Sequence, residues 1–597
     1  MQNQKEQKGT IYGKQKMSVY FQYMPEYLKF QFVSGIIIAV VLFIASNITQ
    51  ILIGSLNRAA FVSGDVKLLF LSAQGWVIIF TYIIVAFIFV GLELNGAIIL
   101  SDKLFKGEET RTFAIIKDAF KSLPLFLNGS GFLLFLYIVI GVPLAGLGFG
   151  VSLTNKLYLP NFITSVIMST PKFAIPYYIA VLVIILFGIR NAFILPAVVL
   201  ENEKASKVVE PAHKLIKDNW RNLLKVAIID TVKLVVILLV ITVVLPAILE
   251  YLFLSEKTPL STVTFVTINF TIFFMLIALI VILMAGCIAV GELTRMYLTY
   301  RDGEPVALKE RREHVLTVKY VPVIIGFMII SIGLTVTIDT QFDELLPQKI
   351  EADVVVHRLG GNYAGENTLE GELKSIASGA AGLETDVQRS ADGVYVINHD
   401  STFERLCGVD KAASEMTAAE IKQLNIIGPD GTVSHPATLV EVLDTAKGKT
   451  HLFIEFKYGD EKMVDDVISM IKERGMENEC TVIGTDYELI SYSKAKYPEV
   501  ETGLLYFFAF GSKSALNGDV MIIEEEAAKL DVILGFKFVG KRVLVWTVNT
   551  EASANRELIK PIDGVISDEP NMCNEVKEKL ENRSEIQRFL DALEIVF

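Results

Sequence analysis

The chain has 597 residues, of which 52% are hydrophobic and 20% are charged, and its formal net charge at pH 7 is −12. Its mean hydropathy is +0.47. This composition excludes an ordinary soluble enzyme of this length and indicates an integral membrane protein with a separate soluble part.

The charge is divided unevenly along the chain. The part after Ile338 holds 47 acidic and 26 basic residues, whereas the part before it is net basic by nine. An asymmetry of this kind separates a membrane module from a soluble module. The sequence therefore predicts two unlike domains.

Seven apolar stretches are long enough to cross the core of a bilayer, for which about 20 residues are needed. They cover residues 30–54, 75–100, 130–153, 173–195, 230–254, 261–290 and 320–338. The first stretch follows a long polar tail and does not have the pattern of a cleaved signal peptide. We expect a cytoplasmic tail over 1–29 and an α-helical polytopic membrane domain over 30–338 with about seven transmembrane helices.

Lys and Arg residues alternate between the segments that join these stretches. Five lie in the N-terminal tail, five between Lys103 and Lys121, five between Lys204 and Arg221, and six between Arg295 and Lys319, whereas the other loops hold one or two each. This is the positive-inside pattern with the N-terminus in the cytoplasm. Seven crossings then predict a multi-pass cell-membrane protein whose C-terminal domain is extracellular.

After a linker over 339–352, short apolar runs alternate with amphipathic segments. The runs cover 353–356, 382–387, 394–397, 452–456, 480–483, 501–507, 520–523, 543–548 and 564–567. Continuous apolar strands separated by helices predict a mostly parallel sheet that is covered on both faces. About 230 residues suit one (β/α)8 TIM barrel of the α/β class. We place this barrel over 353–575 and a C-terminal helix over 576–597.

Ionisable residues gather at the carboxyl ends of these runs, where such barrels hold their chemistry. His357 follows the first run, Glu384 and Asp386 lie in the second, His399 follows the third, and Glu455 lies in the fourth. Because Glu384 and Asp386 are two residues apart on a strand, their side chains share a face. With Glu455 they can form an all-oxygen site for Ca²⁺ or Mg²⁺. The histidines are placed for proton transfer near neutral pH.

Seven motifs occur in a fixed order in this part of the chain. They are His357-Arg358, Glu366-Asn367-Thr368, Glu384-Thr385-Asp386-Val387, Asp392-Gly393, His399-Asp400, Glu455-Phe456-Lys457 and Trp546-Thr547-Val548-Asn549. This series resembles the motifs of the glycerophosphodiester phosphodiesterases, and residues 564–570 resemble the closing strand of that family. The preceding region, on residues 195–224, is similar to the membrane domain that is fused to such enzymes in Gram-positive bacteria.

The resemblance implies a membrane-anchored, metal-dependent phosphodiesterase. Its substrates would be glycerophosphodiesters, or related molecules derived from glycerophospholipids or lipoteichoic acid, and its products glycerol phosphate and an alcohol. The resemblance makes His357 and His399 the acid/base pair, without assigning which is the acid, and makes Glu384, Asp386 and Glu455 the ligands of the divalent metal ion. Membrane lipids are further expected partners, and no nucleic acid is expected.

The resemblance also assigns residues to the phosphate and the substrate. Arg358 and Lys457 would bind the phosphate, and Glu366 would support the site. Trp546 would either pack in the core at the barrel mouth or contact the glycerol end of the substrate.

One position departs from the family pattern. Leu359 stands where the family has glycine after His-Arg, and glycine at such a place serves close backbone approach or an unusual dihedral angle. Gly360 and Gly361 follow directly and can take over that role; the alternative is altered substrate shape or reduced activity. A second function therefore stays open, in which a catalytically weak or inactive barrel acts as a membrane sensor or a transporter-associated binding module.

Overall fold

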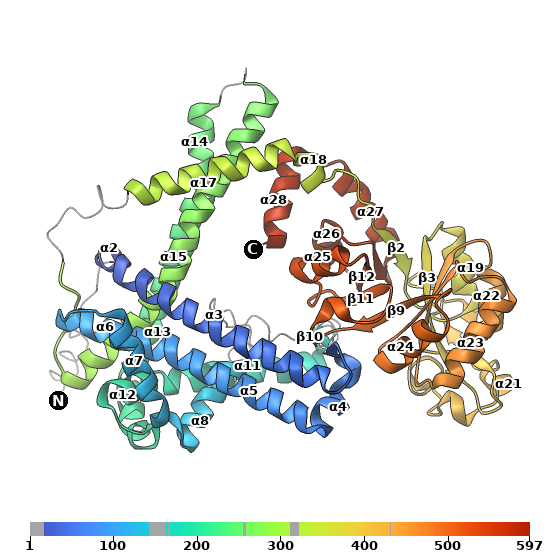
Figure 1. The fold of residues 1–597 in the computed structure, drawn as a ribbon, viewed down its shortest axis with the longest axis horizontal. Helices are drawn as coiled ribbons and strands as arrows, with labels where there is room; N and C mark the ends of the chain where they lie inside the picture. Colours follow the sequence, from blue (N-terminus) through green and yellow to red (C-terminus); the bar gives the residue numbers. More distant parts are fainter. Residues whose placement is uncertain are drawn as a thin grey trace. The chain divides into compact units, whose positions relative to one another are not determined.

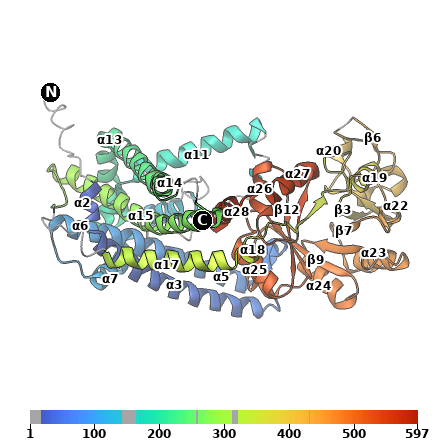
Figure 2. The same ribbon diagram turned by 90° about the horizontal axis from the view of Figure 1, so that it is seen from above.

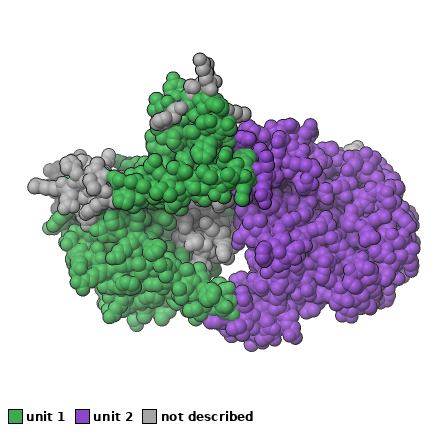
Figure 3. Space-filling view, turned by 45° about the horizontal axis from the view of Figure 1, so that its top comes forward, with its two compact units in different colours: residues 1–47, 79–159, 165–342 green, residues 48–78, 160–164, 343–597 purple. Residues whose placement is uncertain are grey.

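The computed structural model describes residues 17–141, 163–164, 167–168, 170–254, 258–310, 321–429 and 431–596, and it divides the chain into two compact units (Figure 3). Unit 1 comprises residues 1–47, 79–159 and 165–342, and unit 2 comprises residues 48–78, 160–164 and 343–597. Unit 2 therefore includes the segment that joins the first two apolar helices, as well as the C-terminal domain.

Long apolar helices make up the N-terminal half of the chain (Figure 1). Six of the described helices are long and apolar enough to cross a membrane. They cover Met24–Gly54, Ala73–Lys106, Pro171–Glu201, Ala205–Leu252, Ser261–Asp302 and Val321–Thr340. A seventh span results when Thr112–Phe126 and Gly129–Ile140, which are bent by 113°, are taken as one. The predicted helical membrane domain is confirmed; the stretch predicted over 130–153 begins in the bent pair and continues outside the described residues.

The spanning stretches of the long helices are apolar on all sides, and short π-helical turns interrupt them at Gly91–Asn95 and Val240–Val244. Large apolar side chains such as Phe43 and Ile329 are exposed on these helices. Exposure of such side chains is favourable in the hydrocarbon of a membrane and unfavourable in water. The described helices are α2 (Met17–Phe21), α3 (Met24–Gly54), α4 (Val66–Leu71), α5 (Ala73–Val90), α6 (Gly96–Lys106), α7 (Thr112–Ser122), α8 (Gly129–Leu136), α11 (Pro171–Asn191), α12 (Ile194–Glu201), α13 (Ala205–Leu239), α14 (Leu245–Phe253), α15 (Leu260–Asp302), α17 (Val321–Thr340) and α18 (Phe342–Leu345).

Eight parallel strands form a closed barrel in the C-terminal region (Figures 1 and 2). Their order is β2-β13-β12-β11-β9-β8-β7-β3, and pairing of β2 with β3 closes the ring. The strands are β2 (Asp353–Val356), β3 (Gly382–Arg389), β7 (His451–Phe456), β8 (Cys480–Gly484), β9 (Glu501–Tyr506), β11 (Val520–Glu524), β12 (Arg542–Trp546) and β13 (Gly564–Ser567). The predicted TIM barrel is confirmed, and β4 (Tyr395–Ile397) pairs antiparallel with β3.

Alternate strand residues pack in two different places. Val355 and Leu505 belong to the cluster inside the barrel, whereas Val354 and Leu504 belong to the cluster that includes the surrounding helices. Strands buried on both faces read as continuous apolar runs, which is the pattern in the sequence. The surrounding helices are α19 (Leu369–Ala377), α22 (Leu439–Ala446), α23 (Glu461–Glu473), α24 (Tyr487–Lys496), α25 (Leu530–Phe538), α26 (Glu551–Leu558) and α27 (Pro570–Glu581).

Smaller elements complete unit 2. The pair β5 (Ile426–Ile427) and β6 (Val433–Ser434), the strands β1 (Ala60–Val62) and β10 (Ala509–Gly511), and the short helices α20 (Glu404–Cys407) and α21 (Ala418–Ile421) lie outside the barrel sheet. The expected helix over 576–597 is divided into the end of α27 and a separate helix α28 (Glu585–Val596), because Ser584 starts a new helix by accepting a bond from the Gln587 amide.

Candidate active site

The predicted site residues lie at the carboxyl ends of the barrel strands. His357 follows β2, Glu384 and Asp386 lie on β3, and Glu455 lies on β7 beside Asp386 in the strand register. Parallel strands of a barrel present their carboxyl ends at one mouth. The structure therefore brings together residues that are up to 98 positions apart in the sequence.

Three buried carboxylates form the centre of this mouth. Glu384, Asp386 and Glu455 each offer one oxygen within 4.8 Å of the others, and their side chains are almost inaccessible to solvent. Burial and the neighbouring Asp386 and Glu455 carboxylates raise the pKa of Glu384 well above its ordinary value. Burial also raises the pKa of Glu455. Like charges held this close favour either a proton or a bound cation.

Two cationic side chains border the carboxylates. Lys457 Nζ lies 2.6 Å from Glu455 Oε1 and 3.3 Å from Asp386 Oδ1. Although burial opposes the shift, Lys457, His399 and Arg358 lower the pKa of Asp386 to about 2. The Arg358 amide donates to Glu384 Oε2 at 2.8 Å, and its guanidinium lies 3.3 Å from Glu366. The cluster therefore keeps at least one ionised carboxylate at neutral pH.

The three carboxylates fit a hard divalent cation. Among the described residues, Asp386 Oδ1 is a buried oxygen that accepts no hydrogen bond, whereas Asp386 Oδ2 accepts one from Asn367 at 2.9 Å. The Lys457 ammonium, 3.3 Å from this oxygen, offsets part of its charge, and the carboxylate oxygen has further lone pairs that can bind a cation. Carboxylate oxygens are also the ligands that Ca²⁺ and Mg²⁺ prefer.

Each predicted catalytic histidine is held by a carboxylate. His357 Nδ1 lies 2.7 Å from Asp568 Oδ1, and its Nε2 lies 3.8 Å from Glu384 Oε2. Asn549 fixes Asp568 by donating to Oδ2 at 2.6 Å and by accepting from the Asp568 amide at 2.9 Å. Burial opposes ionisation of Asp568, but His357 outweighs it and the pKa of Asp568 falls to about 2. Such a partner on Nδ1 leaves Nε2 for proton exchange with a substrate.

The second histidine has a different anchor. His399 Nδ1 lies 2.8 Å from Asp400 Oδ1, and Arg405 Nε donates to Asp400 Oδ2 at 2.6 Å. Arg405 continues to Glu366, which also pairs with Arg358. Burial lowers the pKa of His399, so its neutral form is favoured near neutral pH. Glu366 therefore links Arg358 to Arg405 through ion pairs, and it is not part of the carboxylate cluster.

Trp546 lies apart from the charged residues. It is the last residue of β12, it is half-buried, and it packs against the apolar cluster inside the barrel. Both alternatives from the sequence, packing in the core and contact with substrate, are compatible with this place at the mouth.

The departure at Leu359 has a structural explanation. Leu359 itself adopts the left-handed conformation, with φ 63°, and is fully buried. That conformation costs a non-glycine residue roughly 1–2 kcal/mol, and burial of a leucine side chain gains roughly 1.5–3 kcal/mol, so burial outweighs the strain. Gly360 and Gly361 serve close approach instead, since a Cβ on either would lie 2.9 Å from a backbone oxygen.

Sequence reasoning missed three residues of the site. Asp568 and Asn549 lie within motifs already noted, and Asp568 follows a strand end as the other acids do, so the same rule could have found it. Arg405 lies on the short helix α20, outside every motif. Its contact with Asp400 and Glu366 depends on the loop conformation, for which the sequence carries no signal.

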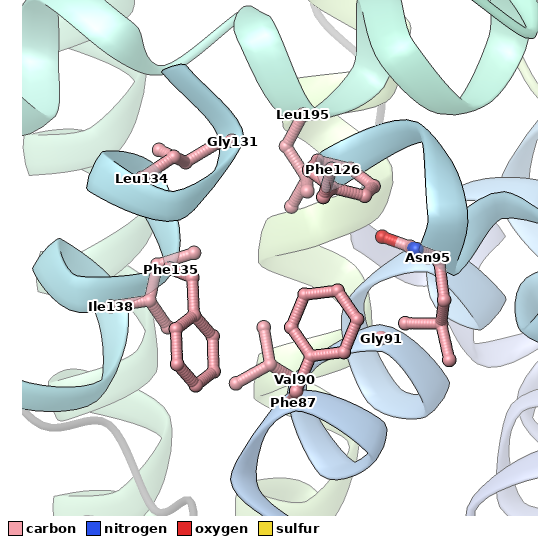
Figure 4. Close-up of a pocket in the computed structure, with 11 residues that line it drawn as sticks. Phe87, Val90, Gly91, Asn95, Phe126, Gly131, Leu134, Phe135, Ile138 and Leu195 are labelled. Carbon is pink, nitrogen blue, oxygen red and sulfur yellow. The ribbon is translucent and has the colours of Figure 1, made fainter. Parts of the chain in front are cut away.

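A small apolar cavity in unit 1 is not part of this site. Figure 4 shows Phe87, Phe126 and Phe135 turned toward it, with Asn95 as the polar side chain among the residues that line it. Its volume is about 20 Å³, roughly the space of one water molecule. It contains none of the residues that carry chemistry in the barrel.

Fold and site together define a membrane-anchored TIM-barrel phosphodiesterase. Residues 14–336 match the family described as "Membrane domain of glycerophosphoryl diester phosphodiesterase", and residues 357–572 match the "Glycerophosphoryl diester phosphodiesterase family". The chain belongs to this family of phosphoric diester hydrolases.

Several known proteins are similar to this chain in sequence or structure. A glycerophosphodiester phosphodiesterase of Caldanaerobacter subterraneus subsp. tengcongensis is 27% identical over 237 residues, which are 36% of this chain and 94% of that protein. The solved glycerophosphodiester phosphodiesterase of Thermotoga maritima is 28% identical, with a TM-score of 0.32, over 38% of this chain and 98% of that one. A phosphodiesterase of Oleispira antarctica, solved in complex with the product sn-glycerol-3-phosphate, is 24% identical, with a TM-score of 0.35, over 39% and 98% of the two chains.

Proposed function

We propose that the barrel is a divalent-metal-dependent hydrolase of glycerophosphodiesters that releases glycerol phosphate and an alcohol. The observation that carries this proposal is the arrangement at the mouth. Three buried carboxylates lie beside Lys457 and Arg358, and each of two histidines is held by its own carboxylate.

The residues of the site suit the two proton transfers of this reaction. One histidine accepts a proton from the attacking water as the water oxygen bonds to phosphorus, and the other donates a proton to the leaving alkoxide as the P–O bond to that group breaks, which gives glycerol phosphate and the free alcohol. Arg358 and Lys457 neutralise the negative charge of the phosphate. A metal ion held by Glu384, Asp386 and Glu455 would supply further charge stabilisation at the phosphoryl oxygens.

A release assay tests this function on the full-length protein in detergent. With glycerophosphocholine as the substrate the products are glycerol phosphate and choline, and with lysophosphatidylcholine they are lysophosphatidic acid and choline, so released choline is measured for both. We expect EDTA to abolish turnover, Ca²⁺ or Mg²⁺ to restore it, and His357→Ala or His399→Ala to lower kcat by about 10²–10⁴-fold. His435→Ala is the matched control, because His435 is exposed and bonds only a backbone carbonyl. Turnover that is insensitive to EDTA and to both site variants would contradict the proposal.

We further infer that the barrel is extracellular and that its substrates derive from membrane lipids or lipoteichoic acid. The loop between the first two spans pairs with the barrel through β1 and β10, so both lie on one side of the membrane. An even number of spans must therefore separate them. If the chain has six spans, five follow the loop, which is an odd number. If the bent pair is a seventh span, six follow it, and the condition is met. Seven spans also agree with the alternation of Lys and Arg between the loops.

Labelling with a membrane-impermeant maleimide tests this orientation. Asn517→Cys in the barrel should react in intact cells. Glu109→Cys, at an exposed position in a predicted cytoplasmic loop, should react only after lysis. Reaction of both positions only after lysis would place the barrel in the cytoplasm.

A further inference from the structure

A segment of the membrane region forms part of the catalytic unit. We call Arg58–Asp65, between the first two apolar helices, the docking loop. Its strand β1 pairs antiparallel with β10, at the label β10 in Figure 1, and residues 60–62 are fully buried. Two flanking bonds extend the ladder, from the Ser512 amide to the Ala59 carbonyl and from the Ser63 amide to the Phe508 carbonyl.

Side chains and close packing also fix the docking loop. Arg58 Nη2 lies 2.6 Å from Glu488 Oε1, and the Arg58 guanidinium lies 4.8 Å above the centre of the Tyr487 ring. A Cβ on Gly64 would lie only 2.1 Å from the Thr485 carbonyl oxygen. Only glycine can therefore make this approach, and the contact is specific rather than incidental.

The docking loop contacts the face of the barrel that holds the chemistry. Thr485 follows the end of β8, and Phe507 follows the end of β9. The Phe507 amide donates to Ser63 Oγ at 3.3 Å. Leu505 points into the barrel, and the two-residue period of a strand continues this inward row to Phe507. The docking loop therefore holds the backbone of an aromatic residue at the mouth.

The mouth holds aromatic side chains as well as charged ones. In the ring of eight strands, β9 lies opposite β2, so Phe507 faces the side of His357 and the carboxylates. Phe507 packs edge-on against Phe508, with ring centres 5.3 Å apart, and Trp546 lies two strands away on β12. After the docking loop, helix α4 exposes Phe70 and Leu71. Phe507 is therefore an apolar side chain at the mouth opposite His357, and Phe70 and Leu71 are exposed apolar side chains on the helix that follows the docking loop.

We propose that the docking loop is a positioning element that makes the enzyme select diesters with a long acyl chain. By fixing Phe507, it forms the apolar wall against which the chain of a lysolipid rests while the phosphate lies among the charged residues. This inference rests on the proposed phosphodiesterase function and names its substrate class.

A pair of substrates that share a headgroup tests the proposal on the full-length protein. We expect Gly64→Ala, which undocks the loop, and Phe507→Ala, which removes the wall, each to lower kcat/KM for lysophosphatidylcholine by about tenfold. For glycerophosphocholine, which lacks the acyl chain, kcat/KM should change less than about twofold. Gly535→Ala is the matched control, because a Cβ there meets nothing within 4 Å, and it should change neither value.

A disulfide tests the docked state independently of activity. Val62 and Ala509 lie directly opposite each other as a non-hydrogen-bonded pair of the antiparallel strands. Such pairs have Cα atoms about 4.5 Å apart, which a disulfide can bridge. Val62→Cys with Ala509→Cys should yield a linked peptide pair under mild oxidant, and the locked enzyme should keep both activities.

Several results would overturn the inference. One is failure of the disulfide to form, and another is loss of activity in the disulfide-locked enzyme. The others are found with Gly64→Ala and Phe507→Ala: equal losses of kcat/KM on the two substrates, or no change in kcat/KM for either variant. A wild-type protein that hydrolyses neither substrate would instead defeat the phosphodiesterase function itself, and the substrate role of the loop with it.

Discussion

Buried carboxylates occur in two regions of unit 2, and the two regions treat them differently. At the mouth, Glu384, Asp386 and Glu455 lie together, and Lys457 is their ammonium partner among the described ion pairs. Among the outer helices, Glu557 is buried but contacts both Lys560 and Arg556, and buried Glu372 has no hydrogen bond to either oxygen. Of these outer carboxylates, Glu557 is neutralised by cationic side chains and Glu372 by a proton, because burial raises the pKa of Glu372 to about 8, whereas the mouth keeps an excess of negative charge that suits a cation.

The largest expected effect comes from removing one charge of the mouth. Glu455→Gln should lower kcat/KM by about 10³-fold, since it removes a ligand of the proposed metal. The melting temperature of the metal-free protein should change little, because the fall in like-charge repulsion is opposed by the loss of the ion pair with Lys457. Steady-state kinetics and thermal melts with and without Ca²⁺ measure both. The exposed Glu461→Gln serves as the control, and a parallel loss of stability and activity would point to a merely structural role.

The next effect concerns the carboxylates that hold the histidines. Asp568→Asn should lower kcat by about 10²-fold and shift the acid limb of its pH profile, because the amide supports a different tautomer of His357. The bond that Asn549 donates to Oδ2 of Asp568 can persist to the side-chain oxygen of the new asparagine, so the fold should survive. An unchanged pH profile with an unchanged kcat would remove Asp568 from the site.

The ion pairs of the outer helices should affect stability alone. Lys560→Met leaves Glu557 buried with Arg556 as its remaining partner. We expect a loss of about 2 kcal/mol, less than the ~3–5 kcal/mol for a fully broken buried pair, which corresponds to about 5 °C in the melting temperature. Turnover at 25 °C should match that of the wild type, and a change in kcat would show that this region is coupled to the mouth.

The smallest effect belongs to Glu372. Burial raises its pKa to about 8, so the folded protein holds a proton that the unfolded chain releases above about pH 4.5. Stability from this group is therefore present at low pH and falls as the pH rises toward 8. Glu372→Met should raise the melting temperature by about 2–4 °C at pH 8 and hardly at all at pH 4.5. An equal gain at both pH values would mean that packing rather than ionisation causes it.

The fold was predictable because its physical signals are local. Apolar stretches near 20 residues long gave the membrane helices, and doubly buried strands gave the barrel. The site was predictable where residues share a strand end, as for Glu384, Asp386 and Glu455, since parallel strands bring these ends to one mouth. The contact of Arg405 with Glu366 and that of Arg58 with Glu488 were not predictable, because each joins segments that are far apart in the sequence and belong to no common motif.

The pairing of β1 with β10 has a consequence for how the protein is made. The partner residues are about 450 positions apart in the chain, so β1 is synthesised long before β10 exists. Contacts of such high sequence separation form late and slowly. Until the barrel has folded, the Ala60-Phe61-Val62 segment has an unpaired edge, which is the kind of strand that joins other chains. Completion of the barrel is therefore also the step that protects the membrane region from misassembly.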